Sequence, residues 1–152
     1  MRTLARAQDK AEIVSRLRRI RPDSARRWGR MSAHQMVCHL CDSSRMALGR
    51  KEVAPTGGLL HRTLVRWIAL NAPVPWRTGI LTNPEIDQEC GGTKPADFSA
   101  DVRELEALVE LMTTKGVSLD GHVHPIFGRL SRGAWLRWAY LHTDHHLRQF
   151  GL

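Results

Sequence analysis

The sequence has little of what a secreted, membrane-spanning or disulfide-stabilised protein needs. It contains three cysteines, an odd number, in 152 residues. The N-terminus lacks the apolar core of a signal peptide. The longest apolar stretch, about residues 59–70, is interrupted by His61, Arg62 and Arg66 and is too short to cross a bilayer. We therefore expect a soluble, cytoplasmic protein with reduced thiols and no membrane association.

The sequence also lacks any long stretch in which apolar and polar residues alternate, which argues against a β-sheet protein. Hydrophobic residues make up 42% and charged residues 25% of the chain, as in an average globular domain. The length corresponds to one domain over residues 1–152, large enough to form a core without metal or disulfide bonds. If this protein binds a metal ion, we therefore expect the ion to have a functional role rather than to stabilise the fold.

Lysine is scarce, because 19 of the 23 cationic residues are arginine. The net charge is +8, and ten of the 23 cations lie within the first thirty residues. This balance is compatible with a non-catalytic protein whose basic surface binds nucleic acid or an acidic partner. It is equally typical of a solvated basic face, and no nucleic-acid-binding motif accompanies the charge. We keep nucleic-acid binding as the alternative function.

Apolar residues recur at helical spacing through most of the chain. Ser32 followed by Gln35 is a capping-box signature, and Ser131 is a suitable N-cap for the last helix. The pattern predicts helices over about residues 7–20, 33–48, 59–70, 99–115 and 132–150. The expected fold is all-α, with four main helices in a bundle, one shorter helix, and long irregular loops over 72–98 and 117–130.

Histidines carry the strongest functional signal. His142 and His146 are four residues apart on the last predicted helix and share its inward stripe with Trp135 and Ala139. His39 lies at the margin of the core face of the 33–48 helix, from which it can reach across the bundle. Three neutral imidazoles would bind a divalent metal and leave coordination positions open. The spacing by itself is also compatible with ordinary hydrogen-bonded core histidines.

The remaining candidate ligands fit less well. His145 lies at the edge of the inward stripe, and His34 lies in a first turn, where the helix meets solvent. Cys38 and Cys41 form a Cys-x-x-Cys pair, a pattern found in redox and zinc sites. On a helix both thiols face away from the proposed core face, and His39 is about 100° from Cys38. We expect these cysteines to be small packed residues beneath a neighbouring helix.

Two motifs extend this pattern over most of the chain. They comprise Trp28, Met31, Ser32, Gln35, Met36, His39, Leu40 and Asp42, and then His124, Pro125, Phe127, Gly128, Leu130, Ser131, Trp135, His142, His145, His146, Gln149, Phe150 and Gly151. Together they resemble an uncharacterised branch of the DinB-like (damage-inducible) superfamily, over about residues 10–152. The resemblance implies a DinB/YfiT-like four-helix bundle with a divalent metal held by His39, His142 and His146.

Better-known members of that superfamily are metal-dependent hydrolases and transferases that use thiols such as bacillithiol or mycothiol. The resemblance therefore implies a metal-dependent S-transferase or hydrolase acting on a small molecule, with a low-molecular-weight thiol as a partner. Zinc, nickel, iron, copper and manganese all stay open as the metal. A monomer and a homodimer are both compatible with the sequence. Asp42 and Asp144 do not point at the metal on ideal helices but could orient its ligands.

The two irregular segments, 72–98 and 117–130, are predicted to form the rim of a pocket above the metal, because long loops in compact domains are often functional. The aromatic residues expected nearest the opening are Trp76, Phe127 and Trp135. Arg77 or Arg129 is expected to hold an anionic group of the substrate. We expect that shortening residues 86–94 alters turnover or substrate affinity and leaves metal content intact.

Overall fold

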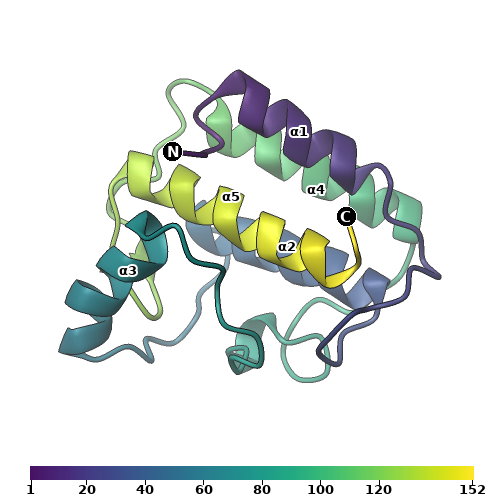
Figure 1. The fold of residues 1–152 in the computed structure, drawn as a ribbon, viewed down its shortest axis with the longest axis horizontal. Coiled ribbons are helices and arrows are strands. Elements are labelled where there is room, and N and C mark those ends of the chain that lie inside the picture. Colours follow the sequence, from purple (N-terminus) through teal and green to yellow (C-terminus); the bar gives the residue numbers. More distant parts are fainter.

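The structure, a computed structural model, describes residues 1–152 and is mostly helical, as the sequence predicts. Four long helices lie side by side, and a shorter helix, α3, packs against one of them, α5 (Figure 1). No helix combines the length and the apolar character that crossing a membrane requires. The helices are α1 (Ala7–Leu17), α2 (Ala33–Ala47), α3 (Arg66–Asn71), α4 (Phe98–Thr113) and α5 (Arg132–Gln149).

The observed helices begin and end within three residues of the predicted bounds. The first helix ends at Leu17 rather than at residue 20. The helix predicted over 59–70 reaches Asn71, and its middle, His61–Val65, is a π-helix (η1) that precedes α3. A 3₁₀ turn, η2 (Pro84–Ile86), lies within the irregular 72–98 segment.

The segment 117–130 contains a small antiparallel hairpin that the sequence did not predict. Its strands are β1 (Val123–His124) and β2 (Gly128–Arg129), with Val123 opposite Arg129 and His124 opposite Gly128. Strands of two residues are too short to produce a visible alternation, which explains why the pattern missed them. The hairpin matters because it places His124 beside the site described below.

The two helices that bear the histidines begin where the sequence predicts. Ser32 accepts a hydrogen bond from the Gln35 amide, and the Gln35 side chain accepts one from the Ser32 amide, which completes the capping box. Ser131 accepts from the Ala134 amide at the start of α5. Both caps satisfy amides that a helix leaves free at its first turn, so the start of each helix is fixed independently of the site.

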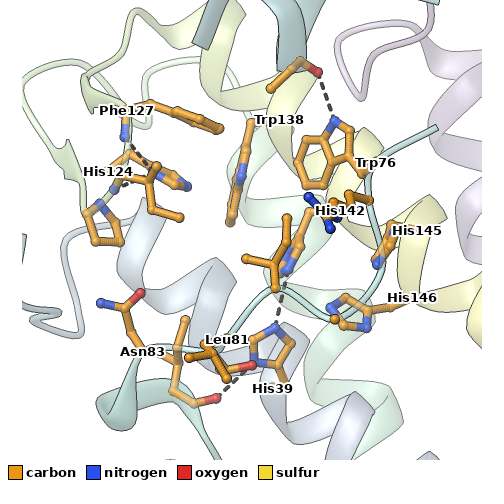
Figure 2. A pocket seen from close by; sticks show the side chains of 18 of the residues that line it. His39, Trp76, Leu81, Asn83, His124, Phe127, Trp138, His142, His145 and His146 are labelled. Carbon is orange, nitrogen blue, oxygen red and sulfur yellow. Dashed lines mark hydrogen bonds between the residues drawn. The ribbon is translucent and has the colours of Figure 1, made fainter. Parts of the chain in front are cut away.

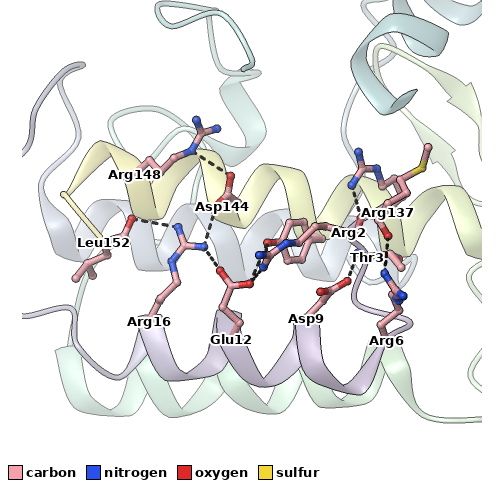
Figure 3. Close-up of polar contacts among 12 residues, drawn as sticks. Arg2, Thr3, Arg6, Asp9, Glu12, Arg16, Arg137, Asp144, Arg148 and Leu152 are labelled. Atoms are coloured by element: carbon pink, nitrogen blue, oxygen red, sulfur yellow. Dashed lines mark hydrogen bonds and ion pairs between the residues drawn. The ribbon is translucent and has the colours of Figure 1, made fainter. Parts of the chain in front are cut away.

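One ion pair, between Arg16 and Asp144, joins α1 to α5, and neighbouring ion pairs extend it within the N-terminal segment and within α5 (Figure 3). Arg16 lies 2.8 Å from the carboxylate of Asp144 and 3.1 Å from that of Glu12, and Arg2 pairs with Glu12. Six of the ten cations in the first thirty residues form ion pairs, namely Arg2, Lys10, Arg16, Arg18, Arg21 and Arg30. Much of the basic N-terminal charge is therefore compensated within the fold.

The Cys-x-x-Cys pair packs against α4, as predicted. Both thiols are buried, and they contact Asp101, Cys38 through the carboxylate and Cys41 through the backbone carbonyl. Burial, followed by the charge of Asp101, raises the pKa of Cys38 to about 12, which favours the protonated thiol at pH 7. His34 was expected to face solvent, but it is half-buried, with its Nε2 2.6 Å from Asp101.

Candidate metal centre

The three histidines predicted as ligands converge at the interface of α2 and α5. Each of His39, His142 and His146 offers a ring nitrogen within 4.8 Å of the corresponding atoms of the other two. The Nε2 atoms of His39 and His142 are 3.2 Å apart. Figure 2 shows the rings turned toward one another, with His39 on one helix facing the pair from α5. The four-residue spacing of His142 and His146 places both on one face of α5, as the helical wheel predicts.

Hydrogen bonds fix the orientation of two of the rings. His39 Nδ1 is 2.8 Å from the carbonyl oxygen of Ile86, which lies in η2. His146 Nδ1 is 2.9 Å from Oε1 of Gln149, whose amide nitrogen donates in turn to the carbonyl of Trp28 at 2.9 Å. Because each Nδ1 faces an acceptor, it carries the proton, and each Nε2 keeps a free lone pair. Metal-ligating histidines are oriented in this way.

His142 is held by packing rather than by a hydrogen bond from its Nδ1. Its ring stacks on Trp138 with centroids 4.8 Å apart and planes 20° apart, and Trp76 lies on another side at 6.1 Å. Trp138 is one turn before His142 on the same helix, so the stack follows from their spacing. This contact limits rotation of the His142 ring and leaves its Nε2 directed at His39.

Burial keeps the cluster uncharged. It lowers the pKa of His39 from its ordinary value, although the hydrogen bond to Ile86 opposes the change. Burial, followed by repulsion from the other imidazoles, lowers the pKa values of His142 and His146 well below the ordinary value. All three imidazoles are therefore neutral at pH 7, the form that binds metals.

The donor set fits a divalent metal ion. Two nitrogen ligands at about 2.0–2.1 Å from a tetrahedral zinc lie about 3.3 Å from each other. The 3.2 Å between His39 Nε2 and His142 Nε2 is close to this value. If both lone pairs faced each other with neither a proton nor a metal between them, they would repel. A cation among the three nitrogens removes this repulsion and satisfies all three lone pairs.

A pocket of about 960 Å³ opens above the three histidines. Parts of both irregular segments line it, as predicted, including Trp76 and Arg77 from 72–98 and Phe127 from 117–130. Trp135 and Arg129 were predicted to lie at the opening, but neither lines the pocket. Trp135 is fully buried in the core, and Arg129 lies outside the pocket, where its guanidinium binds the carbonyl of Gly121. The aromatic residue of α5 that lies beside the cluster is Trp138, which is nearer the middle of the helix than Trp135.

Neither carboxylate proposed to orient the ligands contacts a histidine of the cluster. Asp42 is fully buried and binds Thr93, Gln88 and two cations, whereas Asp144 pairs with Arg16 and Arg148. The carbonyl of Ile86 and the amide of Gln149 orient the rings instead. Asp42 acts on the site indirectly, because it holds the loop that follows Ile86.

His124 is a pocket residue that the sequence placed in a motif without assigning it a role. It is 4% exposed and stacks on Phe127, and its ring lies across Trp138 from His142 (Figure 2). Its Nδ1 accepts hydrogen bonds from the amides of Ile126 and Phe127, so the proton is on Nε2. Burial lowers its pKa to about 3. His124 is therefore a neutral donor beside the pocket.

Fold and site together define a helical protein with a candidate three-histidine metal centre at the base of a pocket. The chain belongs to the family described as protein of unknown function (DUF1569), which matches residues 2–151. No curated protein and no solved structure matches it. The family match covers both helices that carry the histidines and both segments that line the pocket.

Proposed function

We propose that the protein is a metal-dependent enzyme in which His39, His142 and His146 hold a divalent ion. The observation that carries the proposal is the convergence of three neutral imidazoles, two of them with Nδ1 bound to an acceptor, at the base of a pocket. Isolated core histidines do not require a pocket above them. A site with three protein ligands leaves coordination positions for a small molecule, as catalytic sites do.

A divalent ion held there would supply a Lewis acid at the base of the pocket. The protein residues determine what reaches it. Trp76 and Trp138 flank His142, and apolar residues of the two irregular segments line the pocket above the half-buried His142 and His146. None of the side chains that line the pocket is a carboxylate, so the protein supplies no acidic general base there. Transfer to or from a thiol, and hydrolysis, both remain compatible with this arrangement.

The resemblance to the DinB-like superfamily supports the same function. Its implied ligand positions are the three histidines that converge here, and its implied four-helix bundle agrees with the packing of α1, α2, α4 and α5. We infer that the chain is a DinB-like four-helix bundle and that its substrate is a small molecule, with a low-molecular-weight thiol as the first class of co-substrate to test.

Metal analysis of the purified protein tests the proposal. We expect about one divalent ion per chain after reconstitution with zinc, nickel, iron or manganese, and loss of that ion in H39A, H142A and H146A. The matched control is H61A, which removes an exposed histidine from the pocket mouth and should retain the metal. Equal metal content in all variants would contradict the site, and salt-sensitive DNA binding without metal would favour the basic binding protein instead.

A further inference from the structure

The pocket carries positive charge and no negative charge. Arg30 and Arg77 are among the residues that line it, but neither aspartate nor glutamate is. Arg30 is compensated by Asp87 and Glu89, whereas Arg77 is exposed at the pocket mouth and forms no ion pair. The surface that meets a ligand is therefore selective for neutral or anionic groups.

The metal centre strengthens this bias. Three neutral imidazoles leave both charges of a divalent ion uncompensated, because the ligand set contains no carboxylate. The aspartates that act on His39 are Asp42 and Asp87. Asp42 already pairs with Arg45 and Lys51, and Asp87 pairs with Arg30. An external anion is thus the group that would balance the charge of the ion.

The rest of the pocket is apolar, and some of its apolar side chains are exposed at the mouth. Ile68, Val74, Ile80 and Leu81 all line it, and their exposed fractions are 40%, 57%, 63% and 90%. Val74, Ile80 and Leu81 belong to the 72–98 segment, which also contributes Trp76 to the pocket. Clustered exposed apolar residues at the edge of a concave site are typical of a surface that a ligand covers.

We propose that the pocket binds an organic acid with an apolar body, whose anionic group occupies the open positions at the metal and whose hydrocarbon part lies against the 72–98 segment. This inference rests on the proposed metal centre and specifies its substrate class. A small hydrophilic thiol alone would leave most of the apolar wall uncovered, so it would be at most a co-substrate. The pocket, at about 960 Å³, is large enough for a ligand with a hydrocarbon chain or a ring system.

The test uses the full-length protein loaded with cobalt(II), whose visible absorption reports on ligand exchange at the metal. Acetate, hexanoate and decanoate are titrated in turn, with 1-naphthoate as an aromatic acid and 1-decanol as a neutral control. We expect each acid to change the spectrum and each CH₂ that enters the pocket to tighten binding roughly two- to fourfold. Decanol should bind at least roughly tenfold more weakly than decanoate.

A pair of exposed apolar residues provides matched variants. Ile80 lines the pocket, and Leu64 is similarly exposed but lies outside it. I80S should weaken decanoate binding by roughly three- to tenfold and leave acetate binding unchanged, whereas L64S should change neither. Because both side chains are exposed, both variants should fold.

The outcomes separate the two proposals. If cobalt(II) does not bind, the metal centre and the organic-acid site are both wrong. If cobalt(II) binds but acetate and decanoate have equal affinities, or if decanol binds as tightly as decanoate, the metal centre stands and the organic-acid site is wrong. A preference between decanoate and naphthoate then distinguishes an aliphatic from an aromatic body.

Discussion

Gln149 connects His146 to the segment that precedes α2. Its Oε1 lies 2.9 Å from His146 Nδ1, and its Nε2 donates to the carbonyl of Trp28 at the same distance. One buried amide thus sets the ring orientation of a proposed ligand and holds the end of α5 against the 28–32 segment. Rotation of this side chain would break both contacts together.

Replacing Gln149 by leucine should lower metal affinity by roughly 10- to 100-fold, because Nδ1 of His146 loses its acceptor. Q149E should retain most of the affinity, since a carboxylate accepts the same proton. Metal affinity is measured by competition with a chromophoric chelator. Q8L, at an exposed position on α1, is the control for a leucine substitution. Equal losses in Q149L and Q149E would show that His146 does not depend on this acceptor.

Acid should destabilise the protein through His124. Burial lowers its pKa to about 3, whereas the unfolded chain titrates near 6.5. Between these values the unfolded state binds the extra proton, so the contribution of His124 is fully present above pH 6.5 and is lost as the pH falls toward 3. From pH 7 to pH 5 the loss amounts to about 2 kcal/mol.

Urea unfolding at pH 7 and pH 5, in the presence of a chelator, measures this loss. H124N removes the titrating group and keeps an acceptor for the amides of Ile126 and Phe127. The variant should therefore lose about 2 kcal/mol less than the wild type over this pH range. If both proteins lose the same stability, His124 is not the group that titrates.

Asp42 should contribute to stability through the 88–93 loop. Burial by itself raises its pKa, but hydrogen bonds from Thr93 and the charge of Lys51 outweigh burial, and the pKa lies below its ordinary value. D42N weakens the contacts with Thr93 and the two cations, so we expect a loss of about 1–3 kcal/mol in the free energy of unfolding. D23N, at an exposed aspartate, should stay within about 0.5 kcal/mol.

Trp138 should report metal binding by fluorescence. Its ring stacks on His142 with centroids 4.8 Å apart, so a paramagnetic ion such as copper(II) at the site should quench it strongly. W138F should lose more than half of the metal-dependent quenching and keep its stoichiometry by calorimetry. W67F removes a 62% exposed tryptophan outside the pocket and should quench like the wild type. Because Trp76 also lies beside His142, unchanged quenching in the double variant W76F/W138F would place the metal elsewhere.

The 86–94 loop contacts His39 at the metal centre, a role that the sequence did not suggest. Its length predicted a role in substrate access only, with metal content unaffected by shortening. In the structure, Ile86 holds the His39 ring, and Thr93 and Gln88 anchor the loop on Asp42. We now expect that deletion of residues 89–91 changes both substrate binding and metal affinity, which equilibrium dialysis of the metal would show.

Local sequence signals determined most of the helical architecture. The capping box at Ser32 and the cap at Ser131 depend only on residues within one helical turn, and both are confirmed. The positions of His142 and His146 on one face of α5 follow from a spacing of four residues. In the same way, the orientation of Cys38 and Cys41 away from His39 follows from helix geometry.

Contacts between distant segments decided the remainder. The sequence placed His39, His142 and His146 on inward faces, but it contained nothing that would bring the carbonyl of Ile86 to His39 or exclude Trp135 and Arg129 from the pocket. Those outcomes depend on how α2, α5 and two irregular segments pack, and irregular segments have no repeating pattern to indicate their path. Helix periodicity is local and can be read along the chain, whereas burial, ring orientation and lowered histidine pKa values arise only when residues such as His39 and His142, 103 positions apart, are brought together.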